Sequence, residues 1–391
     1  MADHLKSGST SGPNTRLVSA GRRPADQFGF VNTPVYHGST VLYSSADDLY
    51  ANRNRYSYGR RHSPTIDALC DALTELEGAA GTVLAPSGLA AVTTAILAAV
   101  SAGDHMLVAD SVYHPMRHFC DGVLKRFGVE VSYYDPLIGA GIAELMQPNT
   151  KAVFTESPGS QTFEVQDIPA IAGAAHARGA LVLMDNTWAT PLLFDALGHG
   201  VDLSIQAGTK YVSGHADVLI GSVSANAAAW PRLRDTHGDL GLTVGPDDIY
   251  LATRGLRTMG LRLERHHASG LAIARWLLER PEVRRVMHPG LEEDPGHAIW
   301  KRDFRGACGL FGIELEPVEN ARVRRFLDAL ALFGMGYSWG GYESLIVPFD
   351  ISKSRSLPSV FEGPTLRIHI GLEDVADLTA DLDRALAELR T

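Results

Sequence analysis

The chain has 391 residues, of which 45% are hydrophobic and 20% charged, so it is long enough for two packed domains and too apolar for a disordered protein. Its 45 acidic and 35 basic residues give a net charge of −10, which disfavours a surface devoted to nucleic acid or anionic lipid. The first thirty residues lack the apolar segment of a secretory signal, and the three scattered cysteines indicate no disulfide framework, so we expect a cytoplasmic protein.

Residues 1–60 are rich in Ser, Gly, Asn, Arg and Tyr and show only weak periodicity. We interpret them as an extended arm with a short helix or two. An arm of this length in a compact protein usually wraps around a neighbouring body, which indicates a contact beyond its own domain.

From about Thr65 the sequence predicts alternating strands and helices. The predicted strands lie at 80–86, 104–110, 151–158, 180–186, 202–209 and 217–225, and the helices between them at 66–78, 87–103 and 168–179. Short, continuous apolar strands separated by helices favour a mostly parallel sheet that is covered on both faces.

A long amphipathic helix is predicted at 260–281, followed by strands at 308–317, 343–350 and 365–371 and helices at 322–333 and 374–390. This tail indicates a second, smaller α/β layer, with a boundary near Met259. We therefore divide the chain into an arm (1–60), a larger α/β domain (61–258) and a C-terminal α/β domain (259–391).

Three polar features fall at the carboxyl ends of predicted strands, where ligands bind in open α/β sheets. Ser87 and Gly88 open a helix, and such a helix N-terminus suits a phosphate group. Asp185 ends the strand LVLMD, and the strand that begins near Ser204 leads to Thr209 and Lys210.

Lys210 lies in a stretch that is otherwise poor in charge, between apolar runs. A buried ammonium group is costly unless it is paired or loses its proton. A lysine that forms a Schiff base, a carboxylate for a pyridine nitrogen and a phosphate seat are together what pyridoxal 5′-phosphate requires. The hydroxyls of Ser204 and Thr209 could contact its phosphate.

Each feature also has a plainer interpretation. Asp185 could be a turn or helix cap, and Lys210 could be solvated. The segment QAGTKY is not a P-loop, because it lacks the earlier glycine and reverses the Lys–Thr order. His114 and His118 have metal-ligand spacing, but Pro115 between them makes a weak site, and we predict no metal.

From Phe30 to its end the chain resembles the Cys/Met-metabolism pyridoxal-phosphate enzymes. The resemblance rests on nine segments in the family's order: YSYGRRHSPT, ELEGAAGTVLAPSGLAA, DPLIGAGI, ESPGS, MDNTWAT, SIQAGTKYVSGHAD, TRGLRTMGLRL, YSWGGYESL and LRIHIGLED. It implies the fold type I architecture of these enzymes, with a mostly parallel sheet in the large domain and a smaller C-terminal α/β domain.

The resemblance also implies residue roles. Lys210 would carry the Schiff base and Asp185 would pair with the pyridine nitrogen, while Tyr113 would stack on the ring. The phosphate would be bound by Gly88, Leu89, Ser204 and Thr209, joined by Tyr58 and Arg60 of a neighbouring subunit.

The substrate's α-carboxylate would pair with Arg367, helped by Ser338, and Tyr58 and Trp339 would also line the substrate site. The shared site requires at least a dimer, and members of the family are typically tetramers.

Two positions depart from the commoner pattern of the family. Ser160 stands where many relatives have an Asn that contacts the cofactor, and Trp339 stands where γ-acting relatives have Leu. Trp339 favours the β-lyase branch of the family.

The expected reaction is α,β-elimination of L-cystathionine to homocysteine, pyruvate and ammonia. Lys210, with or without Tyr113, would move the Cα proton. The alternatives are a γ-lyase, a methionine γ-lyase or an acylhomoserine sulfhydrylase of the same family, a cofactor-binding regulator, and a lysine lyase that needs no cofactor.

Overall fold

The computed structural model describes residues 11–390, so residues 1–10 of the predicted arm lie outside it. Within this range seven strands form one sheet in the order β1-β7-β6-β5-β4-β2-β3. All neighbours from β6 to β3 run parallel, whereas β7 is antiparallel to both β6 and β1. The prediction of a mostly parallel sheet is confirmed. The strands are β1 (Gly81–Ala85), β2 (His105–Ala109), β3 (Glu130–Tyr134), β4 (Thr150–Glu156), β5 (Leu181–Asp185), β6 (Leu203–Gln206) and β7 (Gly221–Ala225).

The central strands are largely buried, and all five residues of β2 are buried. Because successive side chains of a strand point to opposite faces, such a strand must be covered on both. The helices of this part of the chain are α3 (Pro64–Glu77), α4 (Gly88–Ala99), α5 (His114–Phe119), α6 (Ile168–His176), α7 (Thr190–Leu193), α8 (Trp230–Asp239) and α9 (Pro246–Leu256).

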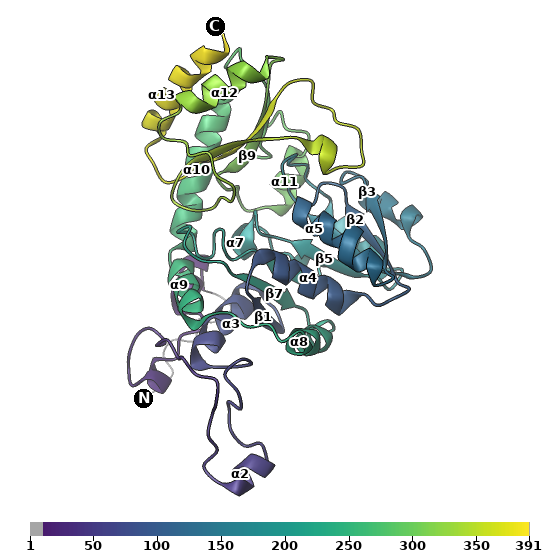
Figure 1. Ribbon diagram of the computed structural model, residues 1–391, viewed down its shortest axis with the longest axis vertical. Helices are drawn as coiled ribbons and strands as arrows, with labels where there is room; N and C mark the ends of the chain where they lie inside the picture. Colours follow the sequence, from purple (N-terminus) through teal and green to yellow (C-terminus); the bar gives the residue numbers. More distant parts are fainter. Residues whose placement is uncertain (1–10, 391) are drawn as a thin grey trace.

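A second, antiparallel sheet has the order β10-β11-β9-β8. Its own apolar core includes Phe311, Phe326 and Ile368. The long helix α10 runs from the large sheet to this smaller sheet (Figure 1). These elements are α10 (Met259–Leu278), β8 (Val283–Met287), α11 (His297–Asp303), β9 (Leu310–Leu315), α12 (Asn320–Ala329), β10 (Leu345–Phe349), β11 (Thr365–His369) and α13 (Val375–Leu386).

The segment before α3 contains two short helices, α1 (Pro13–Ser19) and α2 (Ala46–Tyr50). Figure 1 shows α2 at the end of a long loop that projects from the rest of the chain. Leu42 and Tyr50 on this loop are 85% and 88% exposed. The division of the chain at residues 60 and 258 stays a prediction.

No helix within residues 11–390 is long and apolar enough to cross a membrane. No group of three or more His, Cys, Asp or Glu side chains in this range is placed to hold a metal ion.

Candidate active site

Polar side chains gather where the parallel strands of the large sheet end. Asp185 is the last residue of β5 and is in register with Glu156, the last residue of β4. Lys210 follows four residues after β6 ends at Gln206. The chain order of these strands therefore places two carboxyl groups and one amine at the same edge.

The Lys210 side chain is half-buried, and its amine contacts the C-terminal part of the chain. Its Nζ donates a hydrogen bond of 2.6 Å to the Ser338 hydroxyl and lies 5.4 Å from the ring centroid of Trp339. Burial, together with the nearby Arg367 guanidinium, lowers the pKa of Lys210 to about 8, against the opposing effect of Asp185. The neutral, nucleophilic amine is therefore accessible near neutral pH.

Asp185 is held by the residue two positions after it. Thr187 donates from its backbone N–H (3.0 Å) and its hydroxyl (2.5 Å) to Asp185 Oδ1. Burial raises the pKa of Asp185, while Thr187 and Lys210 act in the opposite direction. The Thr187 hydroxyl also accepts the N–H of Ala207 at 2.8 Å, which ties the acid to the segment that carries Lys210.

The loop at residues 338–341, in the C-terminal part of the chain, packs against Lys210. Ser338 has a φ of +85°, which is unusual for a residue other than glycine, and its carbonyl accepts a 3.0 Å hydrogen bond from Arg367 Nη2. Gly340 has a φ of +84°, and a Cβ at this position would lie 3.0 Å from Lys210 Cβ. The loop therefore requires glycine to approach the lysine.

Tyr113 immediately precedes α5 and faces the same group of charges. Its backbone N–H donates a 2.7 Å hydrogen bond to Glu156 Oε2. Burial raises the pKa of the Tyr113 hydroxyl, as do Glu156 and Asp185, whereas Arg367 lowers it. Tyr113, Asp185, Lys210, Ser338 and Arg367, all predicted from the sequence, thus lie together.

The N-terminus of α4 supplies the predicted phosphate seat. The Ser87 hydroxyl accepts the N–H of Ala90 at 3.1 Å, while the N–H groups of Gly88 and Leu89 have no acceptor within the helix. A Cβ on Gly88 would lie 2.5 Å from the Cβ of Ala207. The helix terminus therefore lies directly against the segment that leads to Lys210.

The two predicted hydroxyl contacts have different surroundings. The Thr209 hydroxyl donates to the carbonyl of Ile220 at 3.2 Å and accepts the N–H of the same residue at 3.0 Å. Ser204 is fully buried and lies beside the Glu77 carboxyl, which also accepts a hydrogen bond from Gln206. This placement gives no support to the predicted phosphate contact of Ser204.

Tyr58 and Arg60 belong to the segment before α3. Tyr58 pairs with Thr40, and Arg60 Nη1 donates to the carbonyl of Gly238 at the end of α8. The N–H of Ser160 donates to the carbonyl of Ser111, two residues before Tyr113, at 2.8 Å.

Two residues of the site were not predicted from the sequence. Thr187 could have been found, because a Thr two residues after an Asp is a common partner of that carboxylate. The sequence signal for Glu156 was weaker, because a single acidic residue at the end of one strand does not by itself indicate a site. Burial first, and then Asp185, raises the pKa of Glu156 well above its usual value.

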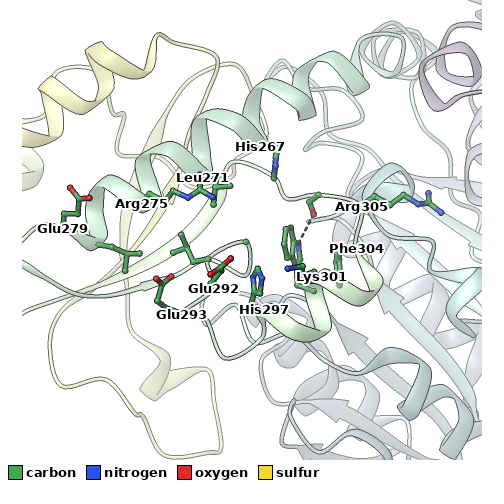
Figure 2. A pocket seen from close by; sticks show the side chains of 15 residues that line it. His267, Leu271, Arg275, Glu279, Glu292, Glu293, His297, Lys301, Phe304 and Arg305 are labelled. Carbon is green, nitrogen blue, oxygen red and sulfur yellow. Dashed lines mark hydrogen bonds between the residues drawn. The ribbon is translucent and has the colours of Figure 1, made fainter.

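A separate groove of about 790 Å³ lies between α10 and α11 (Figure 2). Its walls carry both acidic and basic side chains, including Arg275, Glu279, Glu292 and Lys301. No predicted site residue lines it.

The arrangement fits the cofactor that the sequence predicted. A buried carboxylate can pair with a pyridinium nitrogen, a partly deprotonated lysine can hold an aldehyde, and a helix N-terminus can bind a phosphate. These groups on an open, mostly parallel sheet define a pyridoxal-phosphate-dependent enzyme.

Comparison with known proteins gives the family. Residues 14–387 match the family "Cys/Met metabolism PLP-dependent enzyme". The chain is 56% identical to a putative cystathionine beta-lyase of Rhizobium johnstonii over 381 residues, which cover 96% of each protein. It is 47% identical to cystathionine beta-lyase MetC of Escherichia coli, over 96% of this chain and 98% of the relative.

The crystal structure of metB from Corynebacterium glutamicum is similar in fold, with a TM-score of 0.91 and 32% identity over 97% of this chain and 99% of that one. The chain belongs to the Cys/Met-metabolism family of pyridoxal-phosphate-dependent enzymes. Its fold is the one that the resemblance implied.

Proposed function

We propose that this chain cleaves L-cystathionine by α,β-elimination, releasing homocysteine, pyruvate and ammonia. The observation that carries the proposal is the Lys210 amine, which is buried among Asp185, Ser338, Trp339 and Arg367. The names of the relatives that cover nearly the whole chain support the same reaction.

Arg367 is the proposed partner of the substrate's α-carboxylate. Its guanidinium donates one hydrogen bond to the Ser338 carbonyl. The remaining N–H groups are suited to a bidentate pair with a carboxylate. This pair would orient the substrate so that its Cα proton faces Lys210, with Tyr58 and Trp339 as further contacts.

Lys210 is the proposed base. The bound cofactor supplies an electron-withdrawing ring that makes the Cα proton of the substrate removable, and Asp185 keeps its ring nitrogen protonated. The neutral Lys210 amine takes that proton, Ser338 orients the amine, and Tyr113 is placed to share the transfer. Loss of the homocysteine thiolate from Cβ completes the elimination, and hydrolysis of the released unsaturated amino acid by water gives pyruvate and ammonia.

The other proposed contacts bind the phosphate group of the cofactor. Gly88 and Leu89 would bind the phosphate through their backbone N–H groups, and Thr209 through its hydroxyl. Tyr58 and Arg60 would reach the phosphate of a neighbouring subunit, supported by the bridge between Tyr58 and Thr40 that closes the segment carrying α2. The protein would then be a cytoplasmic homo-oligomer, at least a dimer and by analogy with its family a tetramer.

The test is incubation of the cofactor-loaded protein with L-cystathionine, with pyruvate, 2-oxobutyrate and free thiol measured together. We expect pyruvate and homocysteine in equal amounts, as for a trans-sulfuration step that supplies methionine synthesis. Formation of 2-oxobutyrate and cysteine would instead show a γ-lyase, and the absence of any turnover would favour a regulatory role.

A further inference from the structure

Strand β11 contacts the loop at residues 338–341 through two side chains. Arg367 and His369 are two residues apart, so both point to the same face of the strand. Arg367 binds the carbonyl of Ser338, and His369 Nε2 lies 3.2 Å from the nitrogen of Gly340 and 3.2 Å from the carbonyl oxygen of Gly341. The two contacts lie on either side of Trp339 in the sequence.

Behind this contact lies a second histidine. His266 of α10 is 0% exposed and His369 is 1% exposed, and their ring centroids are 5.2 Å apart. Nδ1 of His266 is 2.8 Å from the carbonyl oxygen of Ile370. The other two ring nitrogens, Nδ1 of His369 and Nε2 of His266, are buried and have no hydrogen-bond partner among residues 11–390.

The hydrogen-bond requirements of these groups select one arrangement of protons. The Ile370 carbonyl can only accept, so His266 Nδ1 carries its proton and His266 Nε2 is left as an acceptor. If His369 Nε2 accepts the N–H of Gly340, His369 Nδ1 carries a proton and needs an acceptor. The two nitrogens have no direct hydrogen bond to one another, so one water molecule between the rings would link the Nδ1 donor to the Nε2 acceptor.

The opposite tautomer of His369 leaves the N–H of Gly340 without an acceptor. A proton on Nε2 would bond the Gly341 carbonyl but would oppose the N–H of Gly340. A buried backbone N–H without an acceptor is less readily tolerated than a carbonyl without a donor, so this arrangement is disfavoured.

We propose that His369 and His266 are positioning residues: as two neutral imidazoles with their protons on Nδ1, they fix the loop at residues 338–341. The loop in turn fixes Ser338 against the Lys210 amine and Trp339 over the substrate pocket. This inference rests on the proposed function, because it assigns the pair a role in the reaction that Lys210 would catalyse.

The surroundings keep both rings neutral. Burial lowers the pKa of His369 to about 3 and that of His266 to about 4. The cations that face His369, Lys210 and Arg367, act in the same direction, as Arg262 does on His266. Tyr211 fills the space between the pair and Trp339, with ring-centroid distances of 5.4 Å to His266 and 5.5 Å to Trp339.

The first experiment compares three variants of the cofactor-loaded enzyme. His369→Ala should reduce kcat/KM for L-cystathionine roughly ten- to hundredfold, mainly through kcat, because the loop loses a buried anchor. His369→Gln should remain within about threefold of the wild type, since its amide oxygen can accept the N–H of Gly340. His288→Gln is the matched control, because His288 is equally buried but binds Gly290, outside the loop.

The second experiment reads the tautomers without any substrate. Histidine-selective ¹⁵N labelling of the wild-type protein, with signals assigned through His369→Gln and His266→Phe, should show Nδ1–H for both residues. His266→Phe keeps a ring in place but removes the acceptor, so His369 should shift toward Nε2–H.

Three outcomes would overturn the inference: an Nε2–H tautomer of His369 in the wild type, wild-type kinetics in His369→Ala, or equal damage in His369→Ala and His369→Gln. Failure of the proposed function would look different. The wild-type protein would then not cleave L-cystathionine, whereas the spectra would still decide the state of the histidine pair.

Discussion

The groups around Lys210 act in opposite directions on the pKa of its amine. Burial and Arg367 disfavour its protonated form, while Asp185 favours it, and the result is a pKa of about 8 instead of 10.5. The folded chain therefore gives up this proton at a lower pH than the unfolded chain. The contribution of Lys210 to the free energy of unfolding rises with pH between these two values and is lost as the pH falls through about 8.

This pKa predicts how the cofactor-free protein takes up pyridoxal 5′-phosphate. The rate should rise with pH and level off above about 8, because only the neutral amine attacks an aldehyde. Stopped-flow absorbance across a pH series measures it. Arg367→Ala should move the midpoint upward, since the guanidinium lowers the pKa. A wild-type midpoint near 10.5 would contradict the burial of the amine.

Trp339 is the residue most directly placed to choose between products. Trp339→Leu removes the ring that lies 5.4 Å from the Lys210 amine and leaves space beside it. We expect a roughly tenfold lower kcat/KM for β-elimination and a larger share of 2-oxobutyrate, measured on L-cystathionine. An unchanged product ratio would remove Trp339 from the selection of products.

The sequence predicted those site residues that combine a special residue type with a strand end or a family segment. Lys210, Asp185, Tyr113, Ser338 and Arg367 are of this kind, and the structure brings them together. Glu156, His266 and His369 were missed because their importance depends on a neighbour far away in the chain. Such neighbours become visible only when strands and helices have packed.

At the scale of elements, the N-terminus of α4 links stability to cofactor binding. Ser87 caps the helix, and the two N–H groups that follow it are free for a phosphate. The cap and the phosphate seat are therefore adjacent, and a mutation can separate their effects.

Ser87→Ala should lower the free energy of unfolding of the cofactor-free protein by about 1 kcal/mol, because the cap is lost. Ser87→Asp should retain that stability but bind the cofactor more weakly, since its carboxylate repels the phosphate. Denaturant unfolding and cofactor titration measure the two effects. Asp167→Ala, which removes the cap of α6 and leaves that of α4 in place, should destabilise the protein with cofactor affinity unchanged. Equal affinity in Ser87→Asp and the wild type would place the phosphate elsewhere.

Elements with a continuous apolar pattern were predicted well, and elements without one were not. The buried strands β1, β2, β4 and β5 follow from their apolar runs, and the helix predicted at 260–281 corresponds to α10 (Met259–Leu278). Strand β3 was missed because it lies at the edge of the sheet and is half-exposed. Helices α8 and α11 carry many polar residues, so their periodicity is weak.

On the scale of the whole molecule, the projecting loop bears on the proposal that the site is shared between subunits. Tyr58 pairs with Thr40 where the loop closes, Arg60 follows it, and Leu42 and Tyr50 are left exposed within one chain. If two chains complete each other's sites, defects in different residues can be corrected by mixing.

Lys210→Ala and Arg60→Ala should each lose most activity, the first through the amine and the second through weaker cofactor retention. When the two variants are mixed, unfolded and refolded together, activity should return to roughly a quarter of the wild type, because half of random dimers are hybrids with one intact site. Refolding each variant alone is the control. No recovery in the mixture would mean that each chain builds its own site.

Glu156 and Asp185 leave two acids on adjoining strand tips inside the protein, with one amine between them and the C-terminal loop. Crowded acids disfavour the native chain whenever both are ionised. A coenzyme that brings a positively charged nitrogen to Asp185 relieves this crowding, so occupancy and resistance to heat must increase together. In a cell short of this coenzyme the enzyme would be present in its less stable, coenzyme-free form. Coenzyme supply would then influence the abundance of the enzyme as well as its rate.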